Sequence, residues 1–144
     1  MTIWQFNYAI SKRLRILNII NLLVGLLMTL VGPFWRGVGS QAVGWSIINI
    51  GIARFGRAQT ARRFAQVEEP YRSDVMGKEA RNLRRLLLVN VLIFNPLYII
   101  GGWRYASRRD SLFQQGIGWG IVLQGVFLFC FDLFHVLNIP RTKR

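Results

Sequence analysis

The sequence predicts an all-α fold: an integral membrane four-helix bundle built from two helical hairpins that form a parallel repeat. Three observations lead to this prediction. The 144 residues are 52% hydrophobic, yet the formal net charge is +13. This combination is typical of chains whose apolar runs are solvated by lipid and whose charges gather in the loops. In addition, the chain contains four apolar runs of membrane-crossing length, and its second half resembles its first half.

Each apolar run approaches the length that crosses a bilayer, which is about 20 residues at 1.5 Å each. The runs extend over residues 14–31, 37–55, 86–102 and 112–139. The first run ends at Gly32 and Pro33, and the fourth ends before Pro140. No small-residue cleavage site follows the first run, so we expect a retained span and not a signal peptide.

The basic residues predict how the spans are oriented. Of the 19 Lys and Arg residues, 15 lie in the amino-terminal segment, in the connection between the second and third runs, and in the tail (Arg141, Lys143 and Arg144). The other four follow the first and third runs: Arg36, Arg104, Arg108 and Arg109. Because positively charged loops stay in the cytoplasm, both termini are expected to be cytoplasmic.

The segments next to the spans also carry structural signals. Trp35 and Trp103 are expected at the outer membrane boundary, and Trp4, Phe6 and Tyr8 at the inner one, as interfacial anchors. The second span is predicted to continue as a helix as far as Pro70, with Ser73 capping the next helix. We therefore expect a cytoplasmic helical connection over residues 58–81.

An internal repeat organises the chain as a single membrane domain, residues 1–144. The segment QAVGWSIINIGIARF, from Gln41, resembles QGIGWGIVLQGVFLF, from Gln115, and RLRILNIIN, from Arg13, resembles NLRRLLLVN, from Asn82. Repeat 1 covers residues 13–57 and repeat 2 covers residues 82–139, each as one hairpin of two spans. Both hairpins enter from the same side, so a pseudo-two-fold axis along the membrane normal is expected to relate them.

Glycines recur at seven-residue intervals on the second and fourth spans. A seven-residue interval is nearly two full turns, so such residues share one helix face. Small residues on one face allow helix backbones to approach closely inside a membrane. The stripes are therefore predicted to pack the even-numbered spans against each other or against their hairpin partners: Gly37, Gly44 and Gly51, and Gly118 and Gly125.

Asp132 continues the second glycine stripe, so it is expected to face protein. An ionised carboxylate in hydrocarbon costs about 2.5–3.5 kcal/mol and needs a partner, for which Arg54 or Arg15 is within reach. His135, the only histidine, follows three residues later on the same side. Further polar residues occupy the inner half of the spans or their mid-depth: Asn18, Asn21, Asn49, Asn90, Asn95 and Gln124.

Three interpretations of this polar cluster remain open. It is a polar knot that fixes helix packing, or a pocket open to the cytoplasmic leaflet for a lipid headgroup, an ion or a proton. In the third interpretation His135 ligates a haem or a chlorophyll-type pigment.

The residue types also exclude several functions. No metal site is expected, because the single cysteine, Cys130, lies within an apolar run. No enzyme is expected either, because no serine, cysteine or second acid accompanies His135 in a recognisable spacing. Nucleic acid is not expected as a partner, because the basic residues only punctuate apolar runs.

Three segments carry a family resemblance: RLRILN, GWSIINIGIA and LQGVFLFCFDLFH. With them, the chain resembles a family of small bacterial four-span membrane proteins known only as a domain of unknown function. The resemblance implies an all-helical bundle, a prokaryotic origin and no known activity. The expected location is the bacterial inner membrane.

The expected function is that of a non-catalytic accessory or scaffolding subunit. Its expected partners are the lipid bilayer, anionic lipid headgroups at the cytoplasmic face, and other membrane subunits or further copies of itself. The alternative is a minimal homodimeric transporter or channel, or a lipid- or pigment-binding membrane subunit.

Overall fold

The computed structural model describes residues 1–140 and is helical throughout, with no strand among these residues. Its four long helices are α1 (Ile3–Met28), α2 (Pro33–Gln66), a composite third helix, and α5 (Leu112–Leu137). The third helix runs without interruption through α3 (Ser73–Val89), η1 (Asn90–Phe94) and α4 (Asn95–Ala106). The predicted all-α class is confirmed. The predicted basic tail of Arg141, Lys143 and Arg144 lies outside the described residues.

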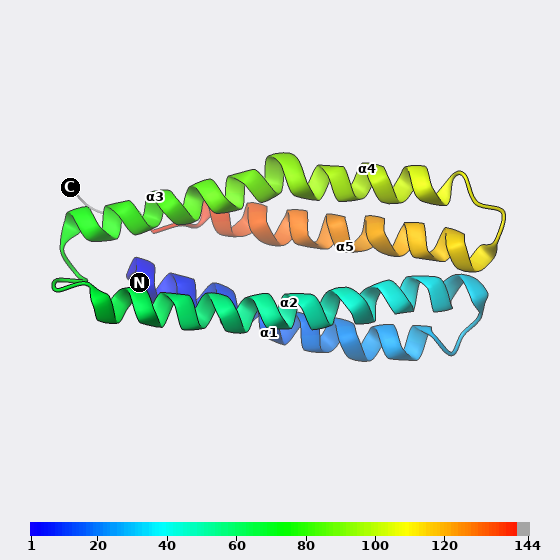
Figure 1. Cartoon of the computed structure of the whole chain (residues 1–144), viewed down its shortest axis with the longest axis horizontal. Helices are drawn as coiled ribbons and strands as arrows, with labels where there is room; N and C mark the ends of the chain where they lie inside the picture. The colour runs from blue at the N-terminus through cyan, green and yellow to red at the C-terminus, as the bar shows by residue number, and fades with distance from the viewer. Residues whose placement is uncertain (141–144) are drawn as a thin grey trace.

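The helices form two antiparallel hairpins that lie side by side (Figure 1). One hairpin contains α1 and α2, and the other pairs the composite third helix with α5. Both hairpin turns lie at one end of the bundle, whereas the N-terminus and the connection between α2 and α3 lie at the opposite end. The packing of α2 against α5 joins the two hairpins.

Local sequence signals account for most helix ends. Thr2 forms a capping box at the start of α1: its hydroxyl accepts from the Gln5 backbone N–H at 3.3 Å, and the Gln5 side chain accepts from the Thr2 N–H at 2.9 Å. Pro33 opens α2 at a position that proline favours. The structure differs from the prediction at the next connection. There α2 ends at Gln66, short of Pro70, and Arg72, not Ser73, is the N-cap residue of α3.

A π-helical turn interrupts the third helix at Asn90–Phe94. Within it, the Asn95 N–H donates to the Asn90 carbonyl, five residues earlier. Pro96 explains this turn, since proline lacks an N–H and its ring clashes with the carbonyl four residues before it. A widened turn relieves the clash without breaking the helix.

Glycines of α5 and two glycines of α2, Gly37 and Gly39, sit at close helix contacts. A Cβ atom added to Gly118 would lie 2.7 Å from the Gly102 carbonyl oxygen of α4, and one added to Gly125 would lie 2.9 Å from Ile99 Cγ1. A Cβ atom on Gly37 would lie 2.7 Å from the backbone nitrogen of Ile117 on α5. The α5 stripe therefore packs on its hairpin partner, and Gly37 packs between the hairpins.

The prediction was wrong for Gly44 and Gly51. Both are exposed, and a Cβ atom on either would meet nothing within 4 Å. A seven-residue spacing shows that residues share a face but does not show which face is packed. The packed face of α2 instead carries Gly39, Ala42, Ser46, Asn49, Ala53 and Thr60.

An apolar core closes the end of the bundle that contains the N-terminus. Trp4 and Phe6 are 2% and 3% exposed, and the Trp4 indole N–H donates to the Pro70 carbonyl at 2.7 Å. Side chains from α2, α3 and the end of the chain pack around them: Phe64, Val75, Met76, Ala80, Leu83 and Ile139. Trp4 and Phe6 are therefore core residues and not the interfacial anchors that the sequence predicted.

Further along the bundle, many of the buried side chains are polar and the exposed ones are apolar. There the interior contains amides and hydroxyls: Asn18 and Ser46 are fully buried, and Asn49 and Asn95 are nearly so. The exterior is aliphatic, with large side chains that are 40–70% exposed on every long helix, such as Leu23, Ile47, Leu92 and Leu123. The bundle thus has an apolar core at one end, and further along it buries polar groups among apolar residues inside an aliphatic surface.

Two of the four long helices, Ser73–Ala106 and Leu112–Leu137, are apolar enough along their length to cross a membrane. The sequence predicted four such helices. Polar side chains lower the mean hydropathy of the other two, including Arg13 and Asn18 in α1 and Ser46 and Asn49 in α2.

Candidate functional site

The buried polar groups form separate hydrogen-bonded clusters along the interior. In the first, the Asn49 amide on α2 donates to the Asn18 side-chain oxygen on α1 at 3.1 Å. The Asn18 amide in turn donates to the Leu14 carbonyl at 2.9 Å. Every strong polar contact of this pair lies within the first hairpin, so the pair holds α1 against α2.

A second cluster links the two hairpins. The Asn21 amide on α1 donates to the Ser46 hydroxyl on α2 at 2.9 Å and to the Gln124 side-chain oxygen on α5 at 3.0 Å. The Gln124 amide returns a longer bond of 3.4 Å to the Asn21 oxygen. Sequence reasoning identified Asn21 and Gln124 but missed Ser46, because a serine within a span carries no distinctive signal.

Asp132 forms the third cluster, with amides as its partners. The Asn95 amide donates to its carboxylate at 2.9 Å, and the Asn90 side chain also faces it from the π-helical turn. Among the described residues, no Lys or Arg forms a salt bridge with Asp132. The predicted ion pair with Arg54 or Arg15 is therefore wrong. Arg15 belongs to α1 and Arg54 to α2, where both line a cleft between these helices, whereas Asp132 faces α4.

His135 is almost fully buried, at 1% exposure. One ring nitrogen, Nδ1, donates to the Phe131 carbonyl at 2.7 Å, which leaves Nε2 as an acceptor for the Arg13 guanidinium at 3.4 Å. Both nitrogens thus have protein partners, and the ring is surrounded by Phe6, Phe131 and Phe134. The iron of a haem, or the magnesium of a chlorophyll-type pigment, would have to displace Arg13 to reach Nε2.

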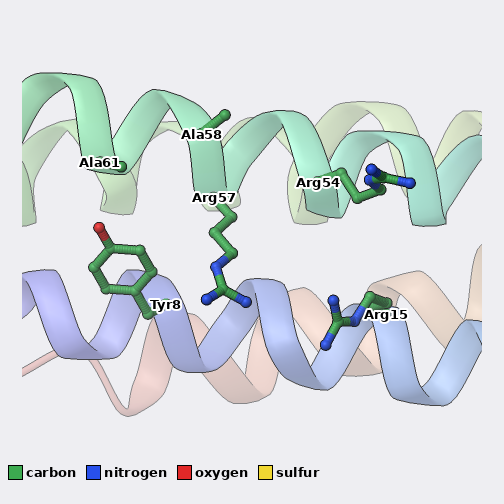
Figure 2. Close-up of a pocket in the computed structure, with 6 residues that line it drawn as sticks. All are labelled: Tyr8, Arg15, Arg54, Arg57, Ala58 and Ala61. Atoms are coloured by element: carbon green, nitrogen blue, oxygen red, sulfur yellow. The ribbon is translucent and has the colours of Figure 1, made fainter.

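An arginine cleft opens between α1 and α2, near the level where the apolar core gives way to the polar interior. We define it by the residues that line it: Tyr8, Arg15, Arg54, Arg57, Ala58 and Ala61. Its volume is about 580 Å³. Figure 2 shows Arg57 reaching from α2 towards α1, with Arg15 and Tyr8 extending from α1 on either side. Two alanines on α2 leave room for the arginine side chains.

The cleft carries an uncompensated positive charge. None of its three arginines forms a salt bridge or a hydrogen bond with another residue in the part of the chain that the structure describes. The acidic side chains that do form salt bridges, Glu69, Asp74 and Glu79, pair with Arg72 and Arg63 instead. Sequence reasoning singled out Arg54 but not Tyr8 or Arg57, because only the packing of α1 on α2 brings them together.

The described residues thus form a small all-helical bundle with buried polar clusters, an aliphatic surface and an arginine cleft between α1 and α2. The chain belongs to a family of unknown function, DUF6992, whose model matches residues 13–133. No curated protein and no solved structure matches the chain.

Proposed function

We propose that the chain is an integral membrane protein of four spans that acts without catalysis, as an accessory or scaffolding subunit in the bacterial inner membrane. The reversal of burial along the bundle carries this proposal. An apolar core inside a polar surface is the arrangement of a protein end in water, whereas an aliphatic surface around a polar interior suits a protein in lipid. Both arrangements occur in this chain.

Low mean hydropathy of α1 and α2 is consistent with a position in lipid. A hydropathy average counts every residue, but lipid contacts only the outward face of a helix. In α1 the outward face carries Ile19, Ile20, Leu23 and Leu27, whereas Asn18, one of the polar residues that lower the average, is fully buried. The outward face of α2 likewise carries Ile47, Ile48, Ile52 and Phe55.

The pattern of hydrogen bonds favours a subunit over a transporter or channel. A hydrated path needs polar atoms that are free to exchange partners with water or a solute. Here the interior amides bind one another across helices, which suits a role in packing. Among the described residues, one buried side-chain polar atom lacks a hydrogen-bond partner, Asn7 Nδ2 near the N-terminus, so the interior clusters leave no row of free polar atoms.

Both termini are expected to face the cytoplasm. The bundle end with the N-terminus also contains the α2–α3 connection, and the 15-to-4 distribution of basic residues favours retaining this end inside. A reporter enzyme that is active only outside the cytoplasm, fused after Arg144, should stay inactive. The same reporter inserted in the turn at residues 29–32 should be active. The reverse result would contradict the topology.

The subunit role predicts a stable association in the native membrane. Purification in mild detergent should recover the chain together with another membrane protein or as an oligomer of itself, as judged by mass spectrometry of the eluate and by its size. Elution of the chain as a monomer without any other protein would contradict the role of subunit.

A further inference from the structure

We propose that the arginine cleft binds a phosphate group, and that Arg15, Arg54 and Arg57 supply the donors. This inference rests on the proposed membrane location only for the source of the phosphate. The cleft itself is a property of the packing of α1 on α2, and it can be tested wherever the protein resides.

Electrostatics is the first argument. Three arginines line one cleft, and none of the described residues that line it carries a carboxylate, so the cleft concentrates positive charge. The same chain neutralises Arg63 with Glu79 at 3.3 Å, a few residues further along α2. An arrangement that leaves three neighbouring arginines without a counter-charge suits a site whose anion comes from outside the chain.

Geometry and chemistry specify the anion. Guanidinium groups present paired N–H donors that match two oxygens of a phosphate, and several of them can share one phosphate from different sides. The Tyr8 hydroxyl adds a further donor in the same cleft. A volume of about 580 Å³ accommodates a phosphate with an attached polar group and exceeds what a halide or a single water would need.

Position suggests the source of the phosphate. On α1 the exposed apolar face begins at Ile16, directly after Arg15, and on α2 it ends at Phe55, directly after Arg54. The cleft therefore lies at the border of the apolar surface, where phospholipid phosphates lie in a bilayer. The arginines would bind the phosphate of an anionic lipid headgroup and a free phosphate through the same contacts. Only the lipid has acyl chains, which would add contacts with the apolar surface.

The test measures the melting temperature of the detergent-purified full-length protein with four additives: phosphatidylglycerol, phosphatidylcholine, glycerol phosphate and inorganic phosphate. The test variant is Arg15→Gln/Arg57→Gln. The matched control is Arg62→Gln/Arg81→Gln, which removes the same charge from exposed helical positions outside the cleft. Far-UV circular dichroism and gel filtration establish that each variant remains folded.

Phosphatidylglycerol should stabilise the parent and the control, and phosphatidylcholine should do so less. In the cleft variant the apparent affinity for phosphatidylglycerol should fall by about tenfold or more, as expected for the loss of two charge-assisted contacts. Equal stabilisation of cleft and control variants would overturn the proposal, because it would show that the lipid is attracted by the overall positive charge of the protein and not by the cleft. Absence of any stabilisation of the parent by all four additives would overturn it as well.

The additives also separate the two sources and the two proposals. A response to inorganic phosphate or glycerol phosphate as strong as that to the lipid, and lost in the cleft variant, would support the site with a soluble ligand. Fractionation of cells expressing the parent tests the membrane location independently. A soluble parent whose cleft still binds phosphate would refute the proposed function and leave the cleft proposal intact.

Discussion

Gly118→Leu is expected to lower the melting temperature of the purified protein by several degrees. At this residue α5 packs closely on α4: an added Cβ atom would lie 2.6 Å from the Ala106 backbone nitrogen and 2.7 Å from the Gly102 carbonyl oxygen. Neither backbone atom can move aside without separating the helices, so overpacking should cost about 1–3 kcal/mol or more. Gly102→Leu, on the opposite side of the same contact, should have a comparable effect. Thermal unfolding followed by circular dichroism in one detergent measures both.

Gly44→Leu is the matched control for this prediction. It inserts the same side chain into α2, at the position equivalent to Gly118 in the sequence repeat, but a Cβ atom there meets nothing within 4 Å. Its melting temperature should be unchanged or slightly higher, because leucine favours the helical conformation over glycine by up to about 1 kcal/mol. A loss at Gly44 as large as that at Gly118 would show that the two stripes pack alike and that the helix contacts are misassigned.

Asp132→Leu is expected to destabilise the protein by about 1–3 kcal/mol, the cost of leaving a buried polar group without its partner. The group concerned is the Asn95 amide, which is 3% exposed and donates to the Asp132 carboxylate. Asp132→Asn should be milder, because an amide oxygen can still accept this hydrogen bond. Denaturation of each purified variant in the same detergent measures the difference.

A double-mutant cycle identifies the partner of Asp132. Asn95→Leu/Asp132→Leu should recover much of the stability lost in Asp132→Leu, since replacing both members of a buried pair removes the unsatisfied group. Arg54→Leu in the same background should recover nothing, because Arg54 lines the cleft between α1 and α2. Recovery of stability with Arg54→Leu but not with Asn95→Leu would support the ion pair between Asp132 and Arg54 that the sequence predicted.

The helix content and the order of the helices could be predicted from the sequence because their causes are local. Apolar runs broken by Gly32-Pro33 and by the polar residues after Ala106 locate the hairpin turns, and the basic connection locates the turn between the hairpins. The prediction of Asp132 as a residue that faces protein also rests on local periodicity. It continues the face of Gly118 and Gly125, and the structure places all three against the third helix.

Other features depended on contacts between distant segments. Periodicity shows which residues share a helix face, but the angle at which that face meets a neighbour is set by packing. For this reason Gly44 and Gly51 could not be distinguished in advance from Gly118 and Gly125. Likewise, no local signal shows that Trp4 packs on Phe64, sixty residues away, in an apolar core.

The sequence by itself determined an all-helical chain of four long helices, with Asp132 on a face that meets protein, because hydrophobic periodicity and helix-ending residues act over a few turns. The tertiary structure alone decided which polar groups meet. Asn95 reaches Asp132 because Pro96 widens the turn before it, and Arg15 lines one cleft with Arg54 and Arg57 because α1 packs on α2 at that register. Such pairings depend on the relative rotation and translation of whole helices, which result from the sum of all their contacts.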